Sequence, residues 1–464
     1  MERNIFKNIS PLDHRYSRRD EFNDYSTYLS EESKVKYQAE VELALVKALA
    51  KRDICSAKVV KEVEAAIEKL STEEVYKEEK KTKHNIRALV NCIQDKVSDE
   101  AKSFIHFTTT SFDIVDTANS LRYKKAADEL ILPTLKELEK LLMEIALREK
   151  ETVQVGRTHG QHAVPVTFGF SIAEYVSRLG NRIAEIERKS QQLKGKISGA
   201  VGAYNASHLF FSEPESFESD VLAELGLEAG SHSTQIVEPE YMTDFVHSLV
   251  SAFGVIANFS DDMRNLQRSE IAEVGEYFGE DQVGSSTMPH KRNPINYENV
   301  KSMWKEFMPR MMTLYQDQIS EHQRDLTNSA SSRFIPELIV GLLSSVNRLI
   351  RTGEKLVVDH QNIKKNFDQN KEMIVAEPLY ILLASYGHPD AHEAVRKLTL
   401  EAEEKDSTLR ELALEKEELE PYVEKFNAKQ KKLLTNPEKY IGIAVEKTES
   451  VVEKYANELE IDLG

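Results

Sequence analysis

Residues 242–266, MTDFVHSLVSAFGVIANFSDDMRNL, carry the clearest pattern in the chain. Apolar side chains recur there in alternating steps of three and four residues, at Met242, Phe245, Leu249, Ala252, Ile256, Phe259, Met263 and Leu266. A repeat of about 3.5 residues is typical of helices that pack side by side with a left-handed twist. The pattern therefore predicts one long helix that belongs to a helical bundle.

Two further stretches repeat this pattern and extend the predicted bundle. The apolar positions are Ile172, Val176, Leu179, Ile183 and Ile186 in the first, and Ile335, Leu338, Leu342 and Leu349 in the second. Long heptad helices usually pack against more partners than one chain supplies. We therefore expect the protein to form oligomers.

The composition agrees with an all-α fold. Gly and Pro number only 18 and 13 among 464 residues, well under the roughly 12% of average usage. Good helix formers, such as Glu, Lys, Leu and Ala, dominate instead. The change from short to long helical patterns and back predicts three domains: an N-terminal helical domain (1–111), a central long-helix domain (112–360) and a C-terminal helical domain (361–464).

Charge and cysteine content exclude several classes of protein. The formal net charge of −17 argues against general binding to nucleic acid. Two cysteines are too few for a disulfide scaffold or a cysteine-based zinc site. No uncharged run reaches the roughly 18 residues of a membrane span, and the N-terminus has no apolar signal core. We expect a cytoplasmic protein that binds neither membranes nor nucleic acid.

The strongest local motif is the segment 284–294, GSSTMPHKRNP. It offers hydroxyl groups, free backbone N–H groups and the two cations Lys291 and Arg292. Two prolines prevent a helix across it. Such a loop is suited to bind carboxylate or phosphate and to stabilise developing negative charge. An ordinary solvated turn is the alternative, but it explains so dense a motif poorly.

This segment resembles the signature loop of the fumarase/aspartase superfamily, Gly-Ser-Ser-x-Met-Pro-x-Lys-x-Asn-Pro, and every defined position matches. The resemblance implies an all-helical fold of three domains, in which long central helices form the core of a tetramer. Enzymes of this superfamily eliminate fumarate from succinyl compounds.

Other segments are similar to the adenylosuccinate lyase family in particular. The matching segments are Ser10–Tyr16, Lys83–Asn85, His106–Ser111, Gly156–Gln161, Gly195–Gly202, Ser233–Gln235 and Gln323–Ser329 with Arg333. The resemblance covers the chain from Ser10 to about Ala444. It implies cleavage of adenylosuccinate to AMP and fumarate, and a parallel cleavage of the succinylcarboxamide imidazole ribonucleotide in purine synthesis.

The resemblance also implies roles for individual residues. Ser285 is the expected base and His159 the expected acid, and neither proton transfer needs a cofactor or a metal. The succinyl carboxylates would be held by Lys291, Asn293, Thr110, Ser111 and Gln235. The phosphate and ribose would be held by Arg15, Tyr16, Arg324, Ser329 and Arg333. Each active site would be shared between subunits of a homotetramer.

A third group of expected substrate ligands is Lys83, His84 and Asn85. The local sequence, in which His84 lies among lysines, indicates only a solvated charged surface. Only the resemblance implies that His84 is a substrate ligand. Asn85 departs from the family, which usually has Asp there. Because the side chain of Asn85 is neutral, a protonated His84 would have no carboxylate at position 85 to stabilise its charge.

Several alternatives stay open. His106 is as easily a structural histidine as a ligand. His159 and His162 have a spacing that binds metal on a helix, but the nearby glycines and Pro165 disfavour a helix there. For the whole chain, the alternatives are another fumarate-releasing lyase, such as argininosuccinate lyase, or a catalytically silent structural homologue.

Overall fold

The computed structural model describes residues 8–16, 25–279, 284, 287–288, 290–405 and 407–464. About 66% of it is helical, and strands are few and short. The chain forms two compact units. The first unit contains Met1–Lys136, Asn181–Gly254 and Ser302–Asn347, and the second contains Glu137–Gly180, Val255–Lys301 and Arg348–Gly464. The predicted three-domain boundaries are not tested by this grouping and stay a prediction.

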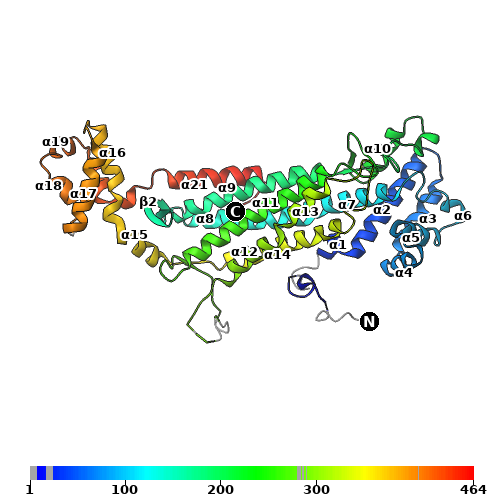
Figure 1. The fold of residues 1–464 in the computed structure, drawn as a ribbon, viewed down its shortest axis with the longest axis horizontal. Helices are drawn as coiled ribbons and strands as arrows, with labels where there is room; N and C mark the ends of the chain where they lie inside the picture. Colours follow the sequence, from blue (N-terminus) through cyan, green and yellow to red (C-terminus); the bar gives the residue numbers. More distant parts are fainter. Residues whose placement is uncertain (1–7, 17–24, 280–283, 285–286, 289, 406) are drawn as a thin grey trace. The chain divides into compact units, whose positions relative to one another are not determined.

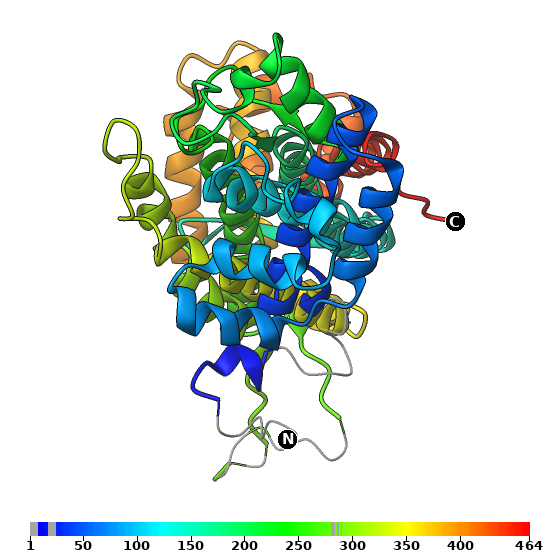
Figure 2. The same ribbon diagram turned by 90° about the vertical axis from the view of Figure 1, so that its right-hand side faces the viewer.

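The first unit is built mainly from short and medium helices (Figure 1). Its helices are α1 (Tyr25–Leu29), α2 (Glu31–Lys51), α3 (Ala57–Glu68), α4 (Thr72–Thr82), α5 (Asn85–Gln94), α6 (Asp99–Lys102), α7 (Ser111–Ala126), α10 (Pro214–Glu224) and α13 (Arg310–Asp317). Short turns are η2 (Pro11–Asp13), η4 (Ser207–Leu209), η5 (Ser331–Phe334) and the π-helical segment η3 (Ala127–Ile131), and β3 (Lys194–Gly195) pairs in parallel with β4 (Glu228–Ala229). Helix α2 packs against α3, α7 and α10, which Figure 2 shows from one end.

Five long helices contribute residues to both units. They are α8 (Leu132–Arg148), α9 (Phe168–Gln191), α11 (Glu240–Leu266), α12 (Ile295–Phe307) and α14 (Ile335–Gly353). The predicted heptad positions lie in α9, α11 and α14, and those of α9 are all fully buried. In α11, Phe245, Leu249 and Ala252 are fully buried, and so are their neighbours Val246 and Phe253. Burial on more than one stripe is typical of a central bundle helix.

Helix α11 is also the one described helix that is long and apolar enough to cross a membrane by composition alone. However, 67% of its most apolar window is buried inside the protein, as in the core helix of a bundle.

The second unit combines a β-hairpin, a short two-stranded sheet and the C-terminal helices. The hairpin is β1 (Val153–Thr158) with β2 (Gln161–Thr167), and β5 (Val274–Gly275) pairs antiparallel with β6 (Val357–Val358). The helices are α15 (His360–Ile374), α16 (Ala376–Ser385), α17 (Ala391–Lys405), α18 (Leu409–Glu415), α19 (Glu420–Val423), α20 (Ala428–Thr435) and α21 (Ala444–Glu458), with the turn η6 (Pro437–Lys439).

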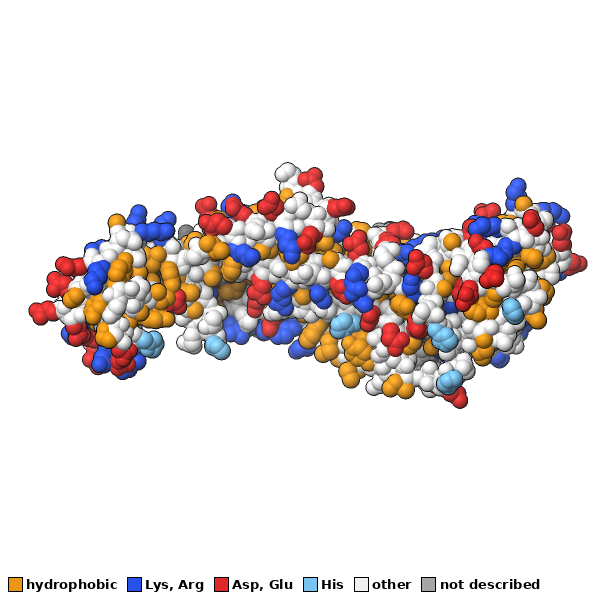
Figure 3. Space-filling view, turned by 90° about the horizontal axis from the view of Figure 1, so that it is seen from above, with side chains coloured by type: hydrophobic (Ala, Val, Ile, Leu, Met, Phe, Trp, Pro, Cys, Tyr) orange, Lys and Arg blue, Asp and Glu red, His pale blue; other side chains and the backbone are white. Residues whose placement is uncertain are grey.

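The C-terminal helices have a hydrophobic core of their own. Buried side chains from α16, α17 and α18, such as Leu379, Leu398 and Leu412, form one continuous cluster. Apolar side chains also gather on the outside of this group, at the left of Figure 3. Ile381 in α16, Leu400 in α17 and Leu414 in α18 are exposed apolar side chains.

Hydroxyl and amide side chains begin many of the helices. Ser30, Ser56 and Ser98 each accept a hydrogen bond from a backbone N–H in the first turn of the helix that follows. Ser71 and Thr408 form complete capping boxes, in which a Glu three residues later bonds back to the cap. Such caps satisfy N–H groups that a helix start leaves unpaired, so they fix the element boundaries from local sequence.

Candidate active site

The predicted site residues divide between the two units. The first unit holds Arg15, Tyr16, Lys83, His84, Asn85, Thr110, Ser111, Gln235, Arg324, Ser329 and Arg333. The second unit holds His159, Lys291 and Asn293. Ser285, the expected base, lies outside the described residues.

Two of the predicted carboxylate ligands lie at the start of α7. Thr110 is the residue before the helix, and its backbone N–H donates to Asp113 Oδ2 at 2.7 Å. Ser111 is the first helical residue. A helix start presents unpaired N–H groups and a positive end of the helix dipole, so hydroxyl groups there are suited to hold an anion.

A buried ion pair beneath this helix start fixes the neighbouring loop. Lys196 Nζ donates to Asp113 Oδ1 and, at 3.1 Å, to the carbonyl oxygen of Gly199. The backbone N–H of Gly199 lies 3.2 Å from both oxygens of Asp113. Both ionic side chains are almost fully buried. Because each charge is paired and further hydrogen-bonded, the pair can hold loop 196–199 against α7.

Gln235 and Arg324 are brought to the same region. The backbone N–H of Gln235 donates to the carbonyl of Gln323 at 3.3 Å. The guanidinium of Arg324 lies 4.0 Å from the ring centre of Phe112, next to Ser111. Burial lowers the pKa of Arg324. Its Nε is buried and bonds to no atom of the described residues, and a buried donor without an acceptor costs free energy.

Asp116 is a carboxyl group that the sequence analysis did not select. It is half-buried one turn after Phe112, and its Oδ2 accepts from the backbone N–H of Val237 at 3.0 Å. Burial raises its pKa to about 6, although the Val237 hydrogen bond and the charges of Lys196 and Arg324 act in the opposite direction. This contact ties the segment that carries Gln235 to α7.

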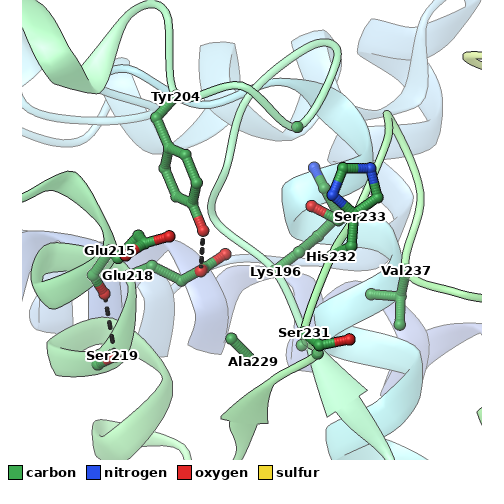
Figure 4. A pocket seen from close by; sticks show the side chains of 13 residues that line it. Lys196, Tyr204, Glu215, Glu218, Ser219, Ala229, Ser231, His232, Ser233 and Val237 are labelled. Atoms are coloured by element: carbon green, nitrogen blue, oxygen red, sulfur yellow. Dashed lines mark hydrogen bonds between the residues drawn. The ribbon is translucent and has the colours of Figure 1, made fainter.

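A polar cavity of about 170 Å³ opens beside these loops (Figure 4). Its lining includes Lys196, Tyr204, Glu218 and Ser233. The hydroxyl of Tyr204 donates to Glu218 Oε2 at 2.6 Å, and the two serine hydroxyls of Ser198 and Ser233 lie 2.7 Å apart. Burial raises the pKa of Glu218 despite its hydrogen bonds. The volume is well below the roughly 300–1,000 Å³ of a typical ligand pocket.

His106 is held by a fully buried carboxylate. Its ring Nδ1 lies 2.8 Å from Glu42 Oε1, and its backbone N–H donates to Glu42 Oε2 at 2.9 Å. Burial alone would lower the pKa of His106, but the hydrogen bond and charge of Glu42 prevail and raise it. His106 thus has a clear structural partner, and a ligand role is not needed to explain its position.

The Lys83–Asn85 segment forms a tight connection between α4 and α5. Lys83 adopts a left-handed conformation with φ 54°, and His84 caps α5. The backbone N–H of Arg87 donates to His84 Nδ1 at 3.2 Å. This nitrogen is therefore an acceptor, and a backbone group orients the exposed ring without a carboxylate at position 85.

The expected phosphate ligands other than Arg324 lie at the surface of the first unit. Arg15 and Tyr16 follow η2, and their backbone N–H groups donate to the carbonyl of Pro11. Ser329 lies in a turn, and Arg333 lies in η5. Arg15, Ser329 and Arg333 are exposed. Their role in phosphate binding stays a prediction.

In the second unit, His159 lies at the tip of the β1–β2 hairpin. Thr158 pairs with Gln161, so His159 and Gly160 form a two-residue turn, with φ of 54° and 73°. Two positive φ values define the turn type that matches strand twist, and glycine is the favoured second residue. His162 lies on β2, so the helical metal spacing is absent. The described residues contain no group of three metal-ligating side chains.

A buried glutamate fixes this hairpin. Glu273, with no exposed surface, accepts two hydrogen bonds from the Arg157 guanidinium at 2.5 and 3.1 Å. It also accepts from Gln154 at 2.6 Å and from Asn366 at 2.8 Å. The guanidinium of Arg157 neutralises the negative charge, and the four hydrogen bonds together satisfy both carboxylate oxygens. His159 itself is exposed, two residues beyond Arg157.

The described part of the signature loop has internal bonds of its own. Asn293 Nδ2 donates to the carbonyl of Gly284 at 3.0 Å, and the Lys291 N–H donates to the carbonyl of Met288 at 3.0 Å. The Lys291 side chain is exposed. Asn293 therefore joins the two ends of the loop, a contact that the sequence analysis did not foresee for an expected carboxylate ligand.

Comparison with known proteins identifies the family. A model of the family "Lyase" matches residues 14–308, and a model described as "Adenylosuccinate lyase C-terminal" matches residues 320–441. The adenylosuccinate lyase of Pyrococcus abyssi is 35% identical over 97% of this chain and 99% of its own. That of Methanocaldococcus jannaschii is 33% identical over 97% and 96%. The chain belongs to the adenylosuccinate lyase family.

Solved structures agree with an all-α fold of the fumarase/aspartase type. The 3-carboxy-cis,cis-muconate lactonizing enzyme of Pseudomonas putida superposes with a TM-score of 0.82, at 23% identity over 97% of this chain and 99% of its own. The fumarate lyase of Mesorhizobium sp. BNC1 superposes with a TM-score of 0.80, at 22% identity over 93% and 97%. The predicted fold class and the predicted family are both confirmed.

Proposed function

We propose that the protein is a carbon–nitrogen lyase that cleaves adenylosuccinate to AMP and fumarate. The same site would cleave the succinylcarboxamide imidazole ribonucleotide during purine synthesis. The observation that carries this proposal is the family assignment, since adenylosuccinate lyases match the chain over nearly its whole length. The sequence pattern adds support, because the loop and the His159 turn retain every residue that the chemistry requires.

The reaction is a β-elimination. A base removes a weakly acidic proton from the succinyl carbon next to a carboxylate, and the resulting negative charge spreads onto that carboxylate. An acid then protonates the departing nitrogen. Ser285 is the proposed base, with Lys291 stabilising its alkoxide, and His159 is the proposed acid. A histidine is suited to this task because it can carry a proton near neutral pH.

The first-unit residues would hold the substrate. Thr110 and Ser111, at the start of α7, and Gln235 would hold succinyl carboxylate, with Lys291 and Asn293 from the loop. The phosphate and ribose would meet Arg324, Arg333 and Ser329, with Arg15 and Tyr16. Lys83, His84 and Asn85 complete the proposed binding set. The position of the half-buried Arg324 guanidinium over Phe112, next to Ser111, supports an anion-binding role.

A homotetramer with active sites shared between subunits is part of the proposal. The exposure of His159 and Lys291 supports it, because a lyase site that excludes water needs a cover. Cavities of about 170 and 260 Å³ in the first unit are too small for a nucleotide. We also propose a cytoplasmic location, supported by the free cysteines Cys55 and Cys92.

The test is direct measurement of fumarate release, by its ultraviolet absorbance, with each of the two succinyl nucleotides and with argininosuccinate. We expect both nucleotides to be cleaved and argininosuccinate to be left intact. Cleavage of argininosuccinate alone, or no cleavage of any of the three, would overturn the proposal.

A further inference from the structure

Glu276 accepts hydrogen bonds from the residues that begin α12. Its Oε1 accepts from the backbone N–H of Asn296 at 2.8 Å and from that of Tyr297 at 3.1 Å. Its Oε2 accepts from the side-chain amide of Asn296 at 2.6 Å. The glutamate is 8% exposed, so these bonds form in a largely water-free setting.

These partners lie on opposite sides of the signature loop in the sequence. Glu276 directly follows β5, which is paired with β6, and Asn296 and Tyr297 are the second and third residues of α12, which begins right after Pro294. Glu276 thus joins the chain entering the loop to the chain leaving it. We call Glu276, Asn296 and Tyr297 the loop clamp.

Neighbouring residues hold each side of the clamp. On the entry side, the Glu276 N–H donates to Gln267 Oε1 at 3.1 Å, and Gln267 Nε2 donates to the carbonyl of Arg292 at 3.3 Å. On the exit side, Arg348 donates to Asn296 Oδ1 at 2.7 Å, and Tyr297 is 1% exposed. The clamp is therefore rigidly placed on both sides.

The hydrogen-bond donors around Glu276 call for an acceptor at this position, although burial opposes its charge. Burial raises the pKa of Glu276, while the N–H groups of Tyr297 and Asn296 and the charge of Arg348 oppose that shift. A negative charge at a helix start is also stabilised by the helix dipole. An alanine would leave three buried donors without an acceptor, which costs free energy at each of them.

We propose that Glu276 is a positioning residue for catalysis, which sets the two ends of loop 284–294 and so places the groups that the loop carries. This inference rests on the proposed function, because the loop is taken to hold the base and Lys291. A displacement of about 1 Å in a catalytic segment can cost on the order of 10²-fold in rate. The clamp thus links packing outside the substrate pocket to the chemical step.

The first experiment compares Glu276→Gln and Glu276→Ala with the wild type. We expect kcat to fall on the order of 10–10²-fold, more for Ala than for Gln, and KM to change much less. Glu270→Gln is the matched control, because Glu270 is exposed on the same segment. It should keep wild-type kcat. Wild-type kcat in Glu276→Ala would overturn the proposal.

The second experiment is a rescue that separates positioning from general loss of stability. In Glu276→Gln, the oxygen that accepts from the Asn296 amide is replaced by an NH₂ group. Two hydrogen-bond donors, the NH₂ group of the new glutamine and that of Asn296, then face each other. Adding Asn296→Asp supplies an acceptor for that amide and keeps an acceptor for Arg348. We expect the double variant to regain most of the kcat lost in Glu276→Gln. Failure of rescue in a well-folded double variant would contradict the clamp.

A third readout does not depend on lyase activity. Lys291 and Arg292 are exposed, so trypsin can cleave after either one. We expect cleavage there to be faster in Glu276→Ala than in wild type and Glu270→Gln, and the double variant to restore the slow rate. Equal cleavage rates in all four proteins would overturn the clamp. An inactive wild type with the expected cleavage pattern would instead overturn only the proposed function.

Discussion

Arg324 is the expected phosphate ligand whose surroundings best support binding. Its guanidinium stacks on Phe112 at 4.0 Å and keeps a buried Nε donor without a protein partner among the described residues. A lysine would keep the charge but lose the planar stacking and the two parallel donors that fit a phosphate.

Arg324→Lys should therefore weaken substrate binding. We expect KM for adenylosuccinate to rise by an amount equivalent to about 1.5–3 kcal/mol, with a smaller change in kcat, because the contact is the same in the ground and transition states. Arg310→Lys is a matched control, since Arg310 also stacks on a phenylalanine, Phe307, outside the predicted site. Equal KM values in all three proteins would remove Arg324 from the binding set.

Glu139, in α8, is a buried acid that is not among the expected site residues. It has no exposed surface, and neither carboxyl oxygen has a hydrogen-bond partner among the described residues. Burial raises its pKa well above the ordinary value. The folded state thus favours the neutral acid. Glu139 therefore makes its whole contribution to the free energy of unfolding at pH values below the ordinary pKa of a glutamate. This contribution is lost as the pH rises through the raised pKa of the folded state.

Glu139→Met should stabilise the protein by removing an unsatisfied buried acid while keeping its volume. We expect a gain on the order of 1–3 kcal/mol, larger at pH 8 than at pH 5, because only the wild type carries the Glu139 carboxyl, whose contribution to stability falls as pH rises. The measurement is Tm by calorimetry at both pH values. A lower Tm than wild type at pH 8 would show that Glu139 has a partner that stabilises it.

Some residues of the candidate site could be predicted from the sequence, and others could not. Arg324 and Gln235 were predicted from the resemblance; Arg324 lies over the ring of Phe112 in α7, and the role of both residues stays a prediction. Glu273 and Asp116 were not predicted, because their partners Arg157 and Val237 are more than 100 residues away in sequence. Local sequence shows a carboxylate but not the donors that the fold brings to it.

At the scale of elements, the long helices were the most predictable part. Their heptad positions follow from hydrophobic periodicity alone, and those of α9 are fully buried. The hairpin β1–β2 was less visible, because its strands are short and its turn, His159-Gly160, gives only a local signal. The sequence analysis excluded a helix there but did not predict strands.

Gly160→Ala tests how the hairpin places His159. Alanine has space at this position, so the cost is the left-handed φ alone, about 1–2 kcal/mol. Gly226→Ala is the matched control, since Gly226 also has a positive φ and free space around it. We expect similar losses of Tm in both variants.

The two variants should differ in rate. Only Gly160→Ala should lower kcat, by about tenfold or more, because a change in the turn moves the adjacent His159. Equal kcat values in the two variants would show that the turn does not set the position of the acid.

At the scale of the molecule, one principle recurs in both units. Several segments that carry expected site residues are held by a buried or half-buried carboxylate, namely Glu42, Asp113, Asp116, Glu273 and Glu276. In the second unit, Glu273 and Glu276 lie at either end of β5, and they hold the His159 hairpin and the loop clamp respectively. Fixed carboxylates preorganise catalytic segments without themselves meeting the substrate.

We propose that His159 and Ser285 are the acid and base of active sites that are shared between chains. The decisive measurement mixes His159→Ala with Ser285→Ala, each expected to lose on the order of 10²–10⁴-fold in kcat, under conditions that exchange subunits. Some hybrid sites then receive neither mutation, so we expect fumarate release from adenylosuccinate to reappear well above either variant alone. Mixtures that stay inactive after subunit exchange has been confirmed would show that His159 and Ser285 of different chains do not serve one shared site.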